Sequence, residues 1–141
     1  MNAIIQKYNI IQIDTLGAHW AGLYRGDQLI EETKRQKQID GTPVQICRNV
    51  NENVTETGLY SSLQYKWSAQ EGDILVVVSD EVRNLLTPIQ IENSFSSKNN
   101  IHPYTDLLDV AAIRIILEAK RVANENPLKD LVAMVMGIEN T

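Results

Sequence analysis

Residues Glu71–Gln90 read EGDILVVVSDEVRNLLTPIQ and contain the most informative local signals in the chain. The opening Glu-Gly-Asp is a tight-turn sequence. Residues 74–78, ILVVV, are apolar and mostly β-branched, and turn or cap residues bound them on both sides. A short apolar run of this kind predicts a strand that is buried on both faces. The stretch therefore predicts a central strand of the fold, followed at once by helical signals.

Two helix starts follow this strand. Ser79 or Asp80 can cap a short helix over residues 81–86. Thr87, with Pro88 after it and Gln90 at the third helical position, has the form of a capping box. A carboxylate at the end of a central strand can cap the next helix, or it can present a ligand to a metal ion. Both interpretations of Asp80 stay open at this point.

The composition is that of an ordinary globular domain. The chain has 141 residues, 43% hydrophobic and 22% charged, which predicts a single domain over residues 1–141. Its net charge of −5 and its lack of a Lys/Arg cluster argue against nucleic acid as a partner. No apolar stretch is long enough to span a bilayer. Cys47 is the single cysteine, which excludes an internal disulfide and fits an intracellular, reducing compartment.

The remaining elements follow from periodicity and turn chemistry. Alternating or apolar runs predict strands, and the two-residue Gly-Asp turn between residues 25 and 28 predicts a hairpin of type II′. We expect a second hairpin to join residues 63–68 to residues 74–78. A helix over residues 106–123, capped by Thr105, has one apolar face. The predicted strands are Tyr8–Leu16, Trp20–Arg25, Gln28–Glu31, Leu63–Ser68, Ile74–Val78 and Leu131–Ile138.

The intervening segments are polar. Thr33–Gln38, which includes Lys34-Arg35-Gln36-Lys37, is expected to be an exposed connection or a short helix, and residues 39–45 and 49–58 are expected to be loops. Antiparallel strands segregated from helices indicate the α+β class, with antiparallel sheets packed against flanking helices.

A family resemblance rests on five segments, taken in order: Gly17–Arg25, Gln28–Thr33, Pro43–Ile46, Gly72–Asp80 and Asp130–Val135. Together they resemble the C-terminal half of a type 2C metal-dependent Ser/Thr protein phosphatase, the PPM type. That family has two antiparallel sheets packed face to face with helices outside, so the resemblance implies a partial αββα sandwich that lacks the N-terminal half. The Pro-Val-Gln-Ile segment is similar to one in a branch whose members are often mitochondrial.

The resemblance implies a metal role for only two residues, Asp80 and Asp130. The family's carboxylates bridge two metal ions that activate water for attack on phosphorus. Here Glu81 follows Asp80 where the family has Gly, and Leu131 follows Asp130 where it has Asn. The family's Gly-Asp-Ser-Arg stretch is Gly-Ala-His-Trp, and the early Asp-Gly-His-Gly or Asp-Gly-Val-Gly segment is missing. Two carboxylates are few for a Mg²⁺ or Mn²⁺ pair, and a helix cap for Asp80 or a turn role for Asp130 is the alternative.

These departures predict a degenerate, catalytically inactive phosphatase-like domain with no catalytic residue and no cofactor. Since half of a two-sheet sandwich exposes sheet edges, we expect protein partners and a role as a structural or binding subunit of a larger complex. The alternative is an active phosphatase, as a fragment or one half of a split site, which would need Mg²⁺ or Mn²⁺. A third interpretation is an unrelated α+β module. The expected compartment is mitochondrial or cytoplasmic.

Overall fold

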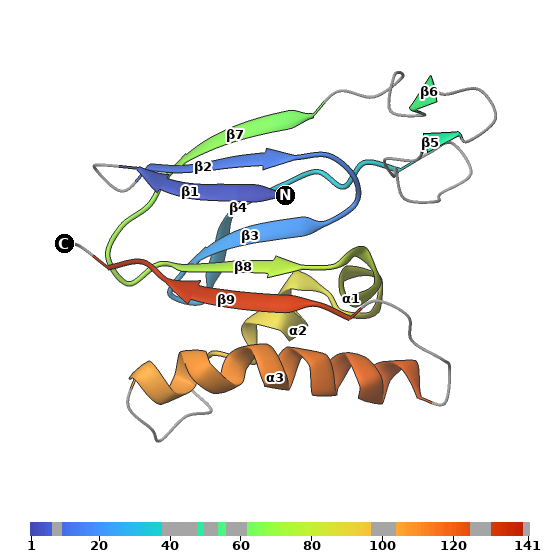
Figure 1. Ribbon diagram of the computed structural model, residues 1–141. Helices are drawn as coiled ribbons and strands as arrows, with labels where there is room; N and C mark the ends of the chain where they lie inside the picture. The colour runs from blue at the N-terminus through green and yellow to red at the C-terminus, as the bar shows by residue number, and fades with distance from the viewer. Residues whose placement is uncertain are drawn as a thin grey trace.

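The structure, a computed structural model, describes residues 1–6, 10–37, 48–49, 54–55, 62–96, 104–124 and 131–139. Its elements follow the chain in the order of strands first and helices later, with one last strand (Figure 1). They are β1 (Asn2–Gln6), β2 (Ile10–Thr15), β3 (Trp20–Arg25), β4 (Gln28–Glu32), β5 (Arg48–Asn49), β6 (Val54–Thr55), β7 (Leu63–Ser68), β8 (Ile74–Val78), α1 (Asp80–Leu85), α2 (Pro88–Glu92), α3 (Tyr104–Ala123) and β9 (Ala133–Gly137).

Two antiparallel sheets form the body of the fold. One has the order β1-β2-β7 and the other has the order β4-β3-β8-β9, while β5 and β6 form a small separate pair. Every strand pairing among the described residues is antiparallel. The helices lie on the side of the four-stranded sheet that faces away from the three-stranded sheet (Figure 1). This arrangement confirms the predicted α+β class and the packing of antiparallel sheets against helices.

The two faces of the four-stranded sheet build two apolar layers. The layer between the sheets combines residues of β2 and β7 with residues of β3 and β8, among them Ile13, Trp67 and Leu75. The layer under the helices is larger, and it includes Trp20 of β3 and Ile115 of α3. Since β8 is buried on both of its faces, it lies at the centre of the fold, as its apolar sequence predicted.

The hairpin predicted between residues 63–68 and 74–78 is wrong. β7 pairs with β2, and β8 pairs with β3 and β9, so the intervening turn carries the chain from one sheet to the other. Ala69 is buried in the layer between the sheets. Gly72 N donates to Ile138 O at 2.9 Å, and Ile138 N donates to Asp73 O at 2.8 Å. These bonds tie the turn to the chain after β9, which a short-range hairpin signal does not anticipate.

Asp73 fixes this crossing by its side chain. Its carboxylate accepts bonds from Arg25 Nε at 3.0 Å and Nη2 at 2.9 Å, and from Gln70 N at 2.8 Å. Buried carboxylates require such compensation, because burial without partners is costly. The pKa of Arg25 is raised, chiefly by its hydrogen bond to Asp73. The Gly-Asp of the sequence motif therefore has a structural role at the end of the sheet.

The helix starts agree with the sequence only in part. Thr87 and Gln90 form the predicted capping box, with Gln90 N donating to Thr87 Oγ1 at 3.2 Å. Ser79 occupies the N-cap position of α1 but makes no capping hydrogen bond to that helix; its Oγ accepts instead from Val132 N at 3.2 Å. The prediction that Thr105 caps the long helix is wrong, because α3 already begins at Tyr104. No helix in the described ranges is long and apolar enough to cross a membrane.

Candidate functional site

Asp80 is the first residue of α1, directly after the end of β8 and the N-cap residue Ser79. Both of its carboxylate oxygens have partners. Arg35 Nη1 donates to Oδ1 at 2.7 Å, and Lys37 Nζ lies 3.3 Å from the same oxygen. Asn84 Nδ2 donates to Oδ2 at 3.2 Å. Arg35 and Lys37 also bind Asn84 Oδ1, at 2.6 and 3.2 Å. The site at Asp80 is thus a compact network of one carboxylate, two cations and an amide.

The segment 33–37 brings the two cations to Asp80. Thr33 is buried, its N donates to Ala21 O, and its Oγ1 accepts from Ala21 N, each at 2.9 Å. Gln36 N donates to Gly17 O at 2.8 Å, and Gly17 N donates to Gln36 Oε1 at 2.7 Å. These reciprocal bonds hold the segment along the start of β3. The prediction of an exposed connection is wrong at Thr33, because its hydroxyl and backbone extend the hydrogen bonding of the sheet edge.

A third cation, Arg83, lies close to the network. Its guanidinium stacks over the ring of Trp20 at 5.4 Å from the ring centroid, and its Nη1 donates to Leu86 O at 3.1 Å. Burial, with a smaller contribution from the charge of Arg35, lowers the pKa of Arg83. On its other side, Trp20 Nε1 donates to Glu32 at 2.8 Å. Trp20, which stands at the Arg position of the family stretch, is buried and serves packing.

This donor set does not fit a divalent metal ion. An ion at Asp80 would have to displace Arg35 and Lys37 from Oδ1, and their positive charges would repel it. Among the residues that the structure describes, no group of three or more His, Cys, Asp and Glu side chains is placed to hold a metal. Asp130, the other predicted ligand, lies outside the described residues, as does the segment Pro43–Ile46. The metal role of either aspartate stays a prediction.

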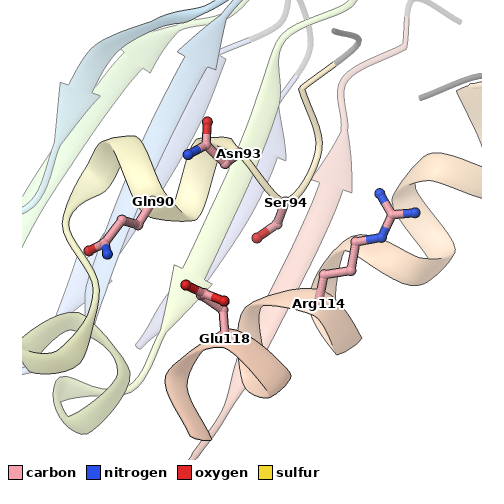
Figure 2. A pocket seen from close by; sticks show the side chains of 5 residues that line it. All are labelled: Gln90, Asn93, Ser94, Arg114 and Glu118. Carbon is pink, nitrogen blue, oxygen red and sulfur yellow. The ribbon is translucent and has the colours of Figure 1, made fainter. Parts of the chain in front are cut away.

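A separate polar cavity lies between α2 and α3. It has a volume of about 270 Å³, and its lining residues are Gln90, Asn93, Ser94, Arg114 and Glu118. Figure 2 shows side chains from α2 and the turn after it on one side and side chains from α3 on the other. The lining combines one cation, one carboxylate and neutral polar groups. It includes no histidine beside Ser94, so these five residues do not form a nucleophile–base pair.

The partners of Asp80 do not follow from the sequence. The polar run Lys34–Lys37 is typical of a solvated connection, whereas in the structure Arg35 and Lys37 are half-buried. The one local signal was Asn84, which lies four residues after Asp80 and therefore on the same face of α1.

Comparisons with known proteins give a similarity of structure and none of sequence. No protein-family model matches the chain, and no curated protein matches it in sequence. The photosystem II phosphatase PBCP matches with a TM-score of 0.65 and 17% identity, over 97% of this chain and 62% of that chain. The Mycobacterium tuberculosis serine/threonine phosphatase PstP matches with a TM-score of 0.64 and 16% identity, over 98% of this chain and 58% of that one. The phosphatase domain of SpoIIE from Bacillus subtilis gives 0.60 and 16%, over 99% and 55%.

These matches show that the chain has a type 2C phosphatase-like fold. At such low identity the matches show the fold alone, because one fold supports many functions and function depends on the site. The chain spans about 55 to 62% of the length of the three phosphatases. A topology without two facing antiparallel sheets would have favoured an unrelated α+β module, and the described residues form two such sheets.

Proposed function

We propose that this chain is a phosphatase-like domain without phosphatase activity, and that it acts as a binding or structural subunit of a larger assembly. The single observation that carries the proposal is the pairing of Asp80 with Arg35 at 2.7 Å and with Lys37 at 3.3 Å. A protein that uses two-metal chemistry needs carboxylates that are free to bind the ions. Here the carboxylate at the matching position is already paired with two side-chain cations.

The electrostatic cost of a metal at this position supports the proposal. Two unit charges 4 Å apart interact by about 4 kcal/mol at an effective dielectric constant near 20, and a divalent ion doubles that. A metal at Asp80 would meet this repulsion from both Arg35 and Lys37 unless both moved away. The bonds of Thr33 and Gln36 to Ala21 and Gly17 keep the backbone of segment 33–37 beside the site, so both cations stay within reach of Asp80.

The proposed partners are proteins. The net charge of −5 disfavours a nucleic-acid role. The proposed compartment is intracellular, mitochondrial or cytoplasmic, and the mitochondrial choice is supported only by the resemblance of residues 43–46 to one branch of the family. Gentle extraction followed by sizing tests the subunit role. We expect the chain in a large particle whose fractions carry no Mn²⁺-dependent phosphatase activity, and migration only as a monomer or a simple dimer of itself would refute that role.

The catalytic part of the proposal is tested by metal binding and turnover with the purified chain. We expect no hydrolysis of para-nitrophenyl phosphate or of a phosphoserine peptide with Mn²⁺ or Mg²⁺, and no Mn²⁺ binding by calorimetry. The double variant Arg35→Ala, Lys37→Ala frees Asp80 and should raise the weak affinity for Mn²⁺ without producing turnover, because one carboxylate is too few to hold a metal pair. Adding Asp80→Ala should remove that gain in affinity, and Lys66→Ala, which removes an exposed cation on β7, should leave the affinity unchanged.

The opposite result would establish the alternative function. Mn²⁺-dependent turnover by the unmodified chain, lost in the Asp80→Ala variant and unchanged in the Lys66→Ala variant, would identify an active metal-dependent phosphatase. In that case Arg35 and Lys37 must leave Asp80 when metal binds, and Asp130→Ala would be the next variant to measure.

A further inference from the structure

β9 is an edge of the four-stranded sheet, and its outer edge is uncharged. The sheet order β4-β3-β8-β9 leaves one side of β9 without a neighbour in the described sheet. Residues 131–138 read LVAMVMGI and contain no ionisable side chain, no proline and no polar side chain. The other edge, β4, carries Glu31 and Glu32. Charges and prolines normally protect edge strands against pairing with another chain, and an apolar edge without them favours pairing.

Exposed apolar side chains flank this edge on both faces of the sheet. On the face opposite the helices, Val132 and Met134 are 53% and 51% exposed. On the helix face, Ile113 and Leu117 of α3 are each 59% exposed. We name these four residues together with the outer edge of β9 the β9 band. Exposed apolar side chains that gather in one region mark an interaction site more often than scattered single residues do.

The position of α3 explains why its exposed residues belong to this band. Ala111, Ile115 and Ala119 face the core. Arg114 and Glu118 line the cavity toward α2, and α2 lies toward β3, since Tyr24 Oη of β3 donates to Pro88 O at 2.8 Å. At 100° per residue, Ile113 falls on the opposite flank of the helix, with Leu117 beside it on the outer surface. α3 packs against β9 (Figure 1), so Ile113 and Leu117 lie on the outer surface of the helix that covers this strand.

We propose that the β9 band binds a second copy of this chain, with the two β9 strands paired antiparallel across a twofold axis near Met134 and Val135. A twofold axis places each strand beside itself in the reverse direction, so one surface supplies both sides of the interface. Uncharged residues then oppose uncharged residues. Pairing of two β4 edges would instead oppose carboxylates, which is unfavourable.

Charges at the two ends of the band are complementary under this symmetry. Glu139 follows the end of β9 and is exposed, while Lys120 is exposed near the C-terminal end of α3. α3 and β9 run in opposite directions, so the Lys120 end of α3 lies near the start of β9 (Figure 1). In the antiparallel pair, the end of one β9 lies beside the start of the other. Each Glu139 therefore approaches the end of the interface at which the second copy carries Lys120.

The first test is the oligomeric state of the purified chain by sedimentation over a concentration series. We expect a dimer, and we expect Met134→Lys to raise its dissociation constant about tenfold or more, since a buried unpaired charge costs at least the 1.4 kcal/mol that a factor of ten represents. Ile89→Lys is the matched control. Ile89 is 71% exposed on α2, away from β9, and its replacement should leave the dissociation constant unchanged.

Cysteine cross-linking tests the strand register directly. In a background with Cys47→Ser, a single cysteine at Met134 or at Val135 should form an intermolecular disulfide on mild oxidation at the one position that lies on the twofold axis, because directly opposed residues of an antiparallel pair have Cα atoms about 4.5–5.5 Å apart. Ile89→Cys should not form one. Circular dichroism verifies that each variant is folded.

A monomer at every concentration would overturn the proposal, and so would a dimer that Met134→Lys leaves intact. Binding of a different protein at the band by a monomeric chain would overturn the choice of a second copy as occupant. None of these results depends on catalysis, because the metal and turnover measurements concern Asp80 and its cations. The inference and the proposed function can therefore fail separately.

Discussion

Replacing Gly22 by alanine should destabilise the fold, although alanine is ordinarily the better strand residue. Gly22 lies in the middle of β3, is buried, and has a φ outside the left-handed region, so its backbone would accept any residue. Space is the obstacle. A Cβ atom there would lie 2.8 Å from Trp20 Cζ2 and 2.9 Å from Leu29 Cδ1, with Trp20 Cη2 closer still. Carbon atoms prefer separations of about 3.5–4.0 Å.

The magnitude follows from which neighbour can move. Leu29 is half-buried and can change rotamer, whereas Trp20 is held between its bond to Glu32 at 2.8 Å and the guanidinium of Arg83. Overpacking a well-packed core costs about 1–3 kcal/mol. Replacing a strand glycine by alanine otherwise raises the free energy of unfolding by about 0.5–1 kcal/mol. We therefore expect Gly22→Ala to lower the free energy of unfolding by about 1–2 kcal/mol.

A double-mutant cycle in urea tests the cause as well as the size. Trp20→Phe removes the ring atoms nearest to the new Cβ atom, at its own cost in packing and in the bond to Glu32. The double variant should be more stable than the sum of the two single changes predicts, by about 1 kcal/mol. Additive changes, or a Gly22→Ala variant as stable as the parent, would show that the Trp20 ring does not fill the space beside β3.

Three further predictions concern the helix layer. Burial raises the pKa of the Tyr24 phenol above its ordinary value of 10.0. Because the folded state favours the neutral phenol, its stabilising contribution is complete below pH 10 and declines as the pH rises further. Tyr24→Phe should therefore reduce the dependence of the unfolding free energy on pH above pH 10. Thr87→Ala removes the capping box and should cost about 1 kcal/mol in urea unfolding, whereas Thr87→Ser should retain most of it. Phe95 is buried, and its ring contacts the ring of Tyr24 edge-on with centroids 5.0 Å apart. Phe95→Ala should lower the free energy of unfolding by about 3 kcal/mol or more in urea, and a much smaller loss would contradict this packing.

Elements that depend on neighbouring residues were predictable from the sequence. The apolar run 74–78 gave the central strand, and Thr87 with Gln90 gave the capping box. The Gly-Asp turn after Arg25 is a two-residue loop, since Arg25 pairs with Gln28, and Gly26 has a φ of +59° as type II′ requires at its first central position. In each case the physical cause acts within a few residues, so periodicity and turn chemistry were sufficient.

Strand partners were not predictable in the same way. The alternation of residues 63–68 correctly indicated a strand, but it carries no information on whether the next strand or a distant one pairs with it. The structure pairs Tyr65 with Ile13 and sends the chain through Ala69 into the other sheet. β1 was missed altogether, because its pairing with β2 depends on contacts that a short N-terminal stretch does not reveal.

The role of Asp80 in the candidate site could also not be predicted from neighbouring residues. An Asp at the junction of a strand and a helix is compatible with a metal ligand or with a local structural role, and nothing near Asp80 in the sequence separates the two. What separates them is the charge that faces the carboxylate, and that charge comes from Arg35 and Lys37 in a distant segment. Their placement depends in turn on Thr33 and Gln36, whose bonds to the start of β3 are ordinary sheet-edge interactions. A motif match at Asp80 is therefore weaker support for metal chemistry than a change in Mn²⁺ affinity when those two cations are removed.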